Sequence, residues 1–245
     1  MLKNMEGQTV PQCSFPIRQN DKWATISTDE IFKGKKVILF ALPGAFTPTC
    51  SSNHLPRFNE LAPVFKEHEI DDIICLSVND PFVMEEWQKQ QDAKHIHFIP
   101  DGNGDFSDGM GMLVDKSNLN FGKRSWRYSM YVDDGAIKKM FIEPEVEGDP
   151  FEVSDADTML KYLAPEAKTP QAITIFTKPG CSHCMRAKEA LKEAELPYEE
   201  IILGKDATFS SLAAVAGAYS TPQIFIEGIR IGGADDLEEY LSLHK

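Results

Sequence analysis

Three of the five cysteines in this 245-residue chain lie where a thiol could act as a nucleophile or a reductant. Cys50 ends the stretch PGAFTPTC, residues 43–50, and Cys181 and Cys184 form a Cys-x-x-Cys pair. A cysteine reacts as its thiolate, which the positive end of a helix and nearby cations favour. The chemistry of both motifs therefore depends on the elements that precede and follow them.

The residues around Cys50 have the pattern of a strand, a loop and a helix. The apolar run 37–42 predicts a buried strand, which Pro43-Gly44 ends. Thr47 followed by Pro48 is typical of a helix start, where a hydroxyl can cap the first turn. This places Cys50 in a first helical turn with the Thr47 hydroxyl beside it. For a cysteine without such neighbours, a buried structural role would be the better interpretation.

This first motif resembles the peroxidatic loop of the peroxiredoxin family, in its atypical, type 5-like branch. The matching residues are Pro43 to Cys50, Ser51 and His54-Leu55-Pro56. The resemblance implies that Cys50 attacks a peroxide and that Thr47 and Pro43 shape the site. The segment Arg-Tyr-Ser-Met at 127–130 is similar to the family's arginine-bearing strand. Arg127 would otherwise be interpreted as a surface charge, but the resemblance gives its guanidinium the role of stabilising the thiolate and polarising the peroxide.

The Cys181–Cys184 pair is compatible with three kinds of site. A zinc site needs four ligands, and an iron–sulfur cluster normally takes four cysteines, so one pair supplies too few for either. A redox dithiol is the favoured interpretation. Cys181 comes at a predicted helix start near Lys178, and Cys184 follows one turn later, close enough to form a disulfide.

The residues around this pair resemble glutaredoxin throughout. Besides the Cys-x-x-Cys loop, the matching segments are Ser220–Ile226 and Ile231–Leu237. The resemblance implies a cis proline and glutathione contacts from Lys178, Thr221, Pro222, Gly233, Ala234 and Asp235. Without it, Gly232-Gly233 would be a simple turn and Thr221-Pro222 the start of an ordinary strand. Many glutaredoxins have an arginine just before the Thr-x-Pro segment, whereas residues 218–220 are Ala-Tyr-Ser here, so one contact to a glutathione carboxylate lacks its residue.

The whole chain resembles hybrid peroxiredoxin–glutaredoxin fusions, and its length exceeds that of a usual single domain. We expect an α/β fold of two thioredoxin-like domains, each a mixed β-sheet flanked by helices. The predicted boundaries are a peroxiredoxin domain at 1–164, a linker at 165–171 and a glutaredoxin domain at 172–245. The linker is short, polar and bracketed by prolines.

Periodicity and turn signals place the other elements of the first domain. We expect strands at 23–28, 72–78 and 97–100, a hairpin at 128–141, a long helix after Cys50 with bends or breaks at Pro56 and Pro63, and a capped helix at 154–163. Residues 101–108 are rich in Gly and Asp but lack the glutamate of an EF-hand, so a solvated loop is predicted there.

The composition favours a soluble protein of a reducing compartment. The chain carries 38 acidic and 25 basic residues, a formal net charge of −13, which opposes binding to nucleic acid or anionic lipid. No apolar run has the length of a signal peptide core or a membrane span. An odd number of cysteines argues against a secreted disulfide framework. We expect a cytoplasmic protein without a metal or a bound cofactor.

A sulfenic acid on Cys50 must be resolved by another thiol before it is oxidised further. Residues 76–180 contain no cysteine, Cys75 is predicted in a strand core, and Cys13 has no activating surroundings. Glutathione is therefore the predicted resolving thiol and reducing co-substrate, and the glutaredoxin dithiol is expected to regenerate Cys50.

We therefore expect a glutathione-dependent thiol peroxidase that reduces hydrogen peroxide and alkyl hydroperoxides. Glutathione reductase would serve it indirectly, and the resemblance suggests a homo-oligomer, a dimer or tetramer, in which transfer within or between subunits is left open. The alternatives are a redox sensor or holdase, and a protein deglutathionylase for which peroxide clearance is secondary.

Overall fold

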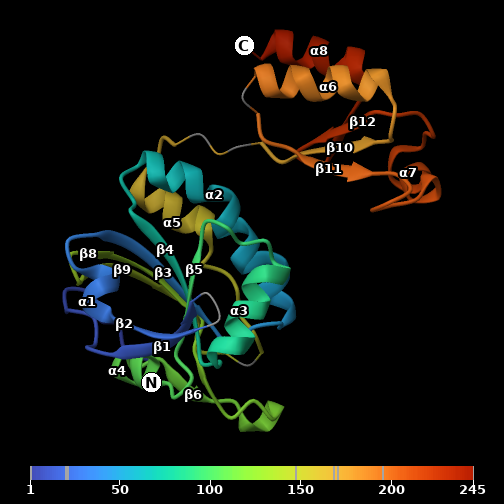
Figure 1. Ribbon diagram of the computed structural model, residues 1–245. Coiled ribbons are helices and arrows are strands. Elements are labelled where there is room, and N and C mark those ends of the chain that lie inside the picture. The colour runs from blue at the N-terminus through green and yellow to red at the C-terminus, as the bar shows by residue number, and fades with distance from the viewer. Residues whose placement is uncertain are drawn as a thin grey trace. The chain divides into compact units, whose positions relative to one another are not determined.

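The computed structural model describes residues 2–19, 22–146, 148–167, 169, 171–194 and 196–244. The chain forms two compact units, Met1–Lys168 and Thr169–Lys245 (Figure 1). The division falls within the predicted linker, of which residues 168 and 170 lie outside the described residues.

The first unit is built on a five-stranded mixed sheet with the strand order β5-β4-β3-β8-β9. Its strands are β3 (Lys36–Leu42), β4 (Asp72–Ser77), β5 (His97–Pro100), β8 (Tyr128–Asp133) and β9 (Ala136–Ile142). Strands β3, β4 and β5 run parallel, whereas β8 is antiparallel to β3 and β9 to β8. Two small antiparallel sheets pair β1 (Ser14–Gln19) with β2 (Lys22–Ser27), and β6 (Leu113–Asp115) with β7 (Lys123–Ser125).

The central strand β3 is buried on both faces, and its side chains alternate between two cores. Val37, Leu39 and Ala41 belong to a core shared with β1, α1 (Thr28–Phe32) and α4 (Asp105–Gly109). Their neighbours on the other face join a core with α2 (Leu55–Glu67), α3 (Pro81–Gln90) and α5 (Ala156–Leu163). Helices α2 and α5 lie side by side in Figure 1. Cys50 and Cys75 both belong to this second core.

The second unit has a four-stranded mixed sheet with the order β11-β10-β12-β13. Its strands are β10 (Ile173–Thr177), β11 (Glu199–Ile202), β12 (Gln223–Ile226) and β13 (Ile229–Gly232). Helices α6 (Ser182–Glu193) and α8 (Ala234–Leu243) share one core with the sheet, while α7 (Phe209–Ala216) packs in a separate one. Both units thus have the mixed α/β architecture that the sequence predicts, and this prediction of fold class is confirmed.

Several local predictions are wrong. Helix α2 continues through Pro63, so the break that was one of the two expectations there does not occur, because buried residues on both sides hold the helix against the core. Residues 101–108 are not a solvated loop. Asp101 is buried and accepts hydrogen bonds from the N–H groups of Phe106 and Ser107, which organises the short helix α4. Helix α5 begins at Ala156, with Asp155 as its cap, rather than at Ser154.

No helix in the described part of the chain is long and apolar enough to cross a membrane.

Candidate active site

Cys50 lies just beyond the carboxyl end of β3, and its side chain is fully buried. The helix begins at Pro48, which confirms that Cys50 is in a first turn. Residues Cys50–His54 form a π-helical turn before α2, which the sequence did not predict. The Thr47 hydroxyl donates to the Gly44 carbonyl (2.9 Å) instead of capping the helix, so that part of the prediction is wrong.

The loop before Cys50 is fixed to the neighbouring strand. The Ala45 N–H donates to Asn79 Oδ1 (3.0 Å), and this oxygen also accepts from the Ser77 hydroxyl (2.8 Å) at the end of β4. Phe46 has a positive φ of 61°, in the left-handed region that a residue with a side chain rarely adopts. The loop thus keeps a defined shape, although the side chain of Phe46 is exposed.

The strand pairing brings Arg127 to Cys50 across 77 residues of sequence. Tyr128 is paired with Ala41 in the antiparallel β3–β8 ladder, so Arg127 comes next to the end of β3. Its Nη1 lies 3.5 Å from Cys50 Sγ, and its Nη2 forms an ion pair with Asp149. Arg127 has an exposed fraction of only 1%, so it is a buried cation rather than a surface charge.

Charge around Arg127 keeps its guanidinium protonated. Burial lowers the pKa of Arg127, but the negative charges of Cys50 and Asp149 outweigh burial, so this pKa lies above its ordinary value. A charged group in a dry site interacts strongly with its partners. The guanidinium can therefore stabilise a thiolate at Cys50 and the charge that develops on a peroxide oxygen.

His54 holds Arg127 from the other side, a role that sequence analysis missed. Its Nε2–H donates to the Ser154 carbonyl (3.0 Å), which leaves Nδ1 to accept from Arg127 Nη1 (3.2 Å). Burial, together with the Arg127 charge, lowers the pKa of His54 to about 3, so the ring is neutral. The sequence matched His54 within a motif, but nothing in its spacing indicated the arginine as its partner.

Cys75 and Cys13 lack such surroundings. Cys75 is fully buried in β4, where burial raises its pKa well above the ordinary value and the Cys50 charge adds to this effect. Partial burial also raises the pKa of the Cys13 thiol. Both thiols are thus held in the protonated form, the less reactive one.

A pocket of about 180 Å³ lies against the loop that precedes Cys50. Its lining residues are Pro43, Thr47, Pro48, Lys116, Leu119, Phe121, Gly148 and Asp149. One wall is therefore the loop that carries Cys50, and another includes the carboxylate paired with Arg127. The predicted residues Pro43, Thr47, Cys50 and Arg127 all lie in this part of the first unit.

The second candidate site is the Cys-x-x-Cys pair in the other unit. Cys181 and Cys184 form a disulfide, with their Cα atoms 5.2 Å apart. Cys181 is the N-cap residue of α6, and its sulfur accepts from the Cys184 N–H (3.1 Å). The Thr221 hydroxyl lies 3.6 Å from the same sulfur, and the Thr221–Pro222 bond is cis, as the resemblance implied.

A pocket of about 280 Å³ adjoins this disulfide. Of the residues predicted to contact glutathione, Thr221, Pro222, Gly233, Ala234 and Asp235 line it. The exposed Lys178 is outside this lining. The pocket also contains Arg186, which is paired with Asp235 and Glu238, and Arg230, which donates to Gln223. Sequence analysis did not single out either arginine.

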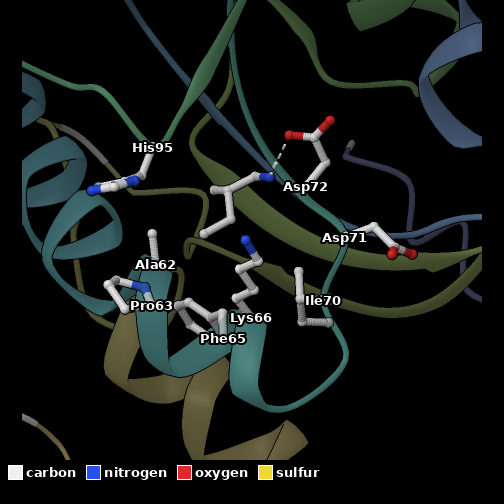
Figure 2. Close-up of a pocket in the computed structure, with 9 residues that line it drawn as sticks. Ala62, Pro63, Phe65, Lys66, Ile70, Asp71, Asp72 and His95 are labelled. Atoms are coloured by element: carbon white, nitrogen blue, oxygen red, sulfur yellow. Dashed lines mark hydrogen bonds between the residues drawn. The ribbon is translucent and has the colours of Figure 1, made fainter.

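A third pocket, of about 380 Å³, lies at the start of β4 (Figure 2). The loop that carries Cys50 follows the other end of the parallel strands. The pocket is formed by the later part of α2 and the start of β4, with Lys66, Asp71 and His95 around it. Within the described ranges, no group of three His, Cys, Asp or Glu side chains is arranged to hold a metal ion.

Comparison with known proteins identifies both units. Residues 5–160 match the redoxin family model, and residues 173–231 match the glutaredoxin model. This chain belongs to the redoxin family. It is 60% identical over 241 residues to the hybrid peroxiredoxin hyPrx5 of Haemophilus influenzae, covering 98% of this chain and 100% of that relative. The predicted hybrid of a peroxiredoxin and a glutaredoxin is thereby confirmed.

Two further similar proteins are peroxiredoxins that each match about two thirds of this chain. Peroxiredoxin sll1621 of Synechocystis is 58% identical over 172 residues, which cover 65% of this chain and 91% of that protein. The crystal structure of reduced Prx3 from Vibrio vulnificus in complex with H₂O₂ is 38% identical with a TM-score of 0.62, covering 66% of this chain and 99% of that one. These relatives support a peroxidase activity for the redoxin domain.

The low pKa of His54 predicts a pH dependence of stability. Between about pH 6.5 and 3 the unfolded chain binds a proton that the folded His54 does not, so stability falls as the pH falls. From pH 6.5 to 5 the resulting loss in the free energy of unfolding is about 2 kcal/mol. We expect the free energy of unfolding of the His54→Gln variant, measured with urea, to fall by that much less than the free energy of the unaltered protein over the same pH range. Tryptophan fluorescence is the appropriate signal because Trp23, Trp87 and Trp126 all lie in the first unit.

The matched control is His95→Gln, which removes an exposed histidine from the same unit. It should leave the pH dependence of the unfolding free energy unchanged. Equal pH dependence in the His54→Gln variant and the unaltered protein would contradict the assignment of a buried neutral ring.

Proposed function

We propose that this chain is a glutathione-dependent peroxidase that reduces hydrogen peroxide and alkyl hydroperoxides. The observation that carries the proposal is the guanidinium of Arg127 at 3.5 Å from Cys50 Sγ, beside a pocket at the peroxidatic loop. A buried cation at this distance favours negative charge both on the sulfur and on the oxygen that it attacks. A glutaredoxin domain in the same chain supports glutathione as the source of electrons.

In the first step the Cys50 thiolate attacks one peroxide oxygen and the O–O bond breaks. The sulfur is oxidised to a sulfenic acid, and the other oxygen leaves as water or an alcohol after taking up a proton. Arg127 stabilises the charge on both oxygens as the bond breaks. Pro43 and Thr47, which form the pocket wall, limit access to the sulfur.

In the second step glutathione resolves the sulfenic acid. Its sulfur displaces the hydroxyl as water and leaves a mixed disulfide on Cys50. The Cys181 thiolate then attacks the glutathione sulfur, which returns Cys50 to its thiolate. A second glutathione releases oxidised glutathione from Cys181, or Cys184 forms the internal disulfide that glutathione later reduces. One peroxide and two glutathione molecules thus give one alcohol or water, one further water and oxidised glutathione.

Attachment of the glutaredoxin unit raises the effective concentration of Cys181 near glutathionylated Cys50 without any new contact. Glutathione is in this scheme a co-substrate rather than a bound cofactor. Glutathione reductase, which is a separate enzyme, would return the oxidised product to its thiol form.

The cysteine roles predict the outcome of a coupled assay with hydrogen peroxide, glutathione, glutathione reductase and NADPH. Cys50→Ser should abolish peroxide-dependent NADPH loss but retain reduction of a small disulfide by the second unit. Cys181→Ser should abolish both activities. Cys184→Ser should retain peroxide turnover, because a second glutathione can replace its thiol.

The matched control for these substitutions is Cys13→Ser, which removes a partly buried cysteine without an assigned role. Peroxide turnover retained in Cys50→Ser would sink the assignment of the peroxidatic thiol. Slow turnover with a persistent oxidised Cys50 in the unaltered chain would instead favour a redox sensor. Turnover of glutathionylated proteins without peroxide turnover would favour a deglutathionylase.

Lys116 is the residue of the pocket that can attract an anionic thiol. Its ammonium lies 4.5 Å from the centre of the Trp126 ring, and among the described residues it has no acidic partner. Glutathione carries two carboxylates and one ammonium, so it is attracted by this cation, whereas hydrogen peroxide is neutral. We expect Lys116→Ala to slow the reaction of glutathione with oxidised Cys50 about two- to fivefold, the usual effect of a partly exposed ion pair.

This reaction can be followed in a single turnover in the Cys181→Ser background. Oxidation of Cys50 by hydrogen peroxide should keep its rate in Lys116→Ala. The control Lys123→Ala changes an exposed lysine on β7 that does not line the pocket, and it should affect neither step. An unchanged glutathione step in Lys116→Ala would exclude this role for the lysine.

A further inference from the structure

The segment that follows β9 supplies contacts to both Arg127 and His54. Asp149 forms the ion pair with Arg127, and the Ser154 carbonyl accepts from His54 Nε2 (3.0 Å). The Phe151 ring centre lies 5.0 Å from the His54 ring centre and 5.6 Å from Arg127 Cζ. This segment thus contacts Arg127 directly through Asp149 and Phe151, and it holds His54, another partner of Arg127.

This segment has no regular structure of its own to fix these contacts. Within 144–154, residue 147 excepted, none of the residues belongs to a helix or a strand. An irregular segment of this kind samples many conformations unless other groups hold it. Its position therefore depends on contacts with residues outside it, hydrogen bonds among them.

The carboxylate of Glu143 makes four such hydrogen bonds. Its Oε1 accepts from the N–H groups of Val153 (2.9 Å) and Ser154 (2.7 Å) and from the Ser154 hydroxyl (2.7 Å). Its Oε2 accepts from the Glu152 N–H (2.8 Å). Glu143 has an exposed fraction of 1%, so these bonds are shielded from water and replace the hydration that the buried carboxylate has lost.

Glu143 is itself joined to the strand that carries the arginine. Its N–H donates to the Arg127 carbonyl (3.1 Å), which extends the β8–β9 ladder by one pair. Its carbonyl accepts from Trp126 Nε1 (2.9 Å). The backbone of Glu143 therefore has a fixed position next to Arg127. Its side chain binds residues 152–154, so these residues are held at a defined distance from Arg127.

We propose that Glu143 is a positioning residue for the peroxide reaction, an inference that rests on the proposed role of Cys50 and Arg127. Through residues 152–154 it fixes the Ser154 carbonyl, which sets the tautomer of His54 and leaves Nδ1 free to accept from Arg127. Through the same residues it limits the positions that Phe151 and Asp149 can take against the guanidinium. Displacements of about 1 Å in such groups can cost about 100-fold in rate.

The test is the Glu143→Gln variant of the full chain. A carboxamide has one oxygen, so the Nε2 group would face the Glu152 N–H and set two donors against each other. We expect the second-order rate constant for oxidation of Cys50 by hydrogen peroxide to fall at least tenfold. Reduction of a small disulfide by the Cys181–Cys184 unit should keep its rate, which shows that the second unit is intact and reduced. Tryptophan fluorescence, which comes from the first unit alone, should show that the unit containing Glu143 is folded.

The matched control is Glu152→Gln, the same substitution at an exposed carboxylate of the same segment, and it should leave peroxide oxidation unchanged. Ser154→Ala removes only one of the four donors and should give a smaller loss, about two- to fivefold, in a variant that disturbs folding less. If Glu143→Gln fails to fold, Ser154→Ala decides the question, and an unaltered oxidation rate there would overturn the proposal.

A spectroscopic measurement separates positioning from general stability. The side-chain ¹⁵N signals of His54 should show the Nε2–H tautomer in the unaltered protein and lose it in Glu143→Gln. A folded Glu143→Gln variant with an unchanged tautomer and an unchanged oxidation rate would overturn the proposal. Failure of Cys50 in the unaltered chain to react with peroxide would instead refute the proposed function, and the His54 signals would still decide whether Glu143 positions the ring.

Discussion

The contact between the buried guanidinium of Arg127 and the sulfur of Cys50 is the interaction that the surrounding parts of the first unit position and stabilise. Removing a charged group from water is costly unless partners replace its hydration. Arg127 finds these partners in Cys50, Asp149 and the unprotonated nitrogen of His54. If the ring of His54 were protonated, it would repel the guanidinium, so the neutral state of the buried ring is part of the same arrangement.

These partners come from distant parts of the chain, and the sheet brings them together. The parallel strands β3 and β4 end beside the loop that carries Cys50, and the antiparallel strand β8 brings Arg127 to the same place. The segment after β9 then closes the site through the hydrogen bonds of Glu143. A displacement of the β3–β8 register would move Arg127 away from Cys50, so the register is a functional as well as a structural constraint.

Much of this could be predicted from the sequence. Continuous apolar runs predicted β3 and β4, and the Asp133-Asp134-Gly135 turn predicted the β8–β9 hairpin. The cysteine motifs located both candidate sites because the residues of each motif follow one another closely in the chain. Arg127 was assigned its role by resemblance alone, since its partner lies 77 residues away.

The remaining features depend on tertiary contacts that local patterns do not encode. The role of His54 requires the Ser154 carbonyl, 100 residues later, and Asp101 is buried because it binds N–H groups five and six residues ahead. In the sequence, Glu143 is indistinguishable from an ordinary charged residue after a strand, and its role follows only from its hydrogen bonds to residues 152–154. The π-helical turn at Cys50 has no sequence signal that we recognise.

In the second unit, the disulfide and the neighbouring pocket are built from residues close together in the chain, which is why three sequence segments were enough to outline them. The residues missed there, Arg186 and Arg230, belong to elements whose packing brings them to the pocket. The link between the two units is chemical in our account: a glutathionyl group formed on Cys50 is passed to Cys181.

That link can be examined directly by peptide mass spectrometry. A chain with Cys181→Ser and Cys184→Ser is treated with one equivalent of hydrogen peroxide and excess glutathione, and its cysteine-containing peptides are then mapped without reduction. The account predicts glutathione attached to Cys50, with Cys13 and Cys75 unmodified. A disulfide between Cys50 and Cys75 or Cys13, or an absence of glutathione on Cys50, would contradict it.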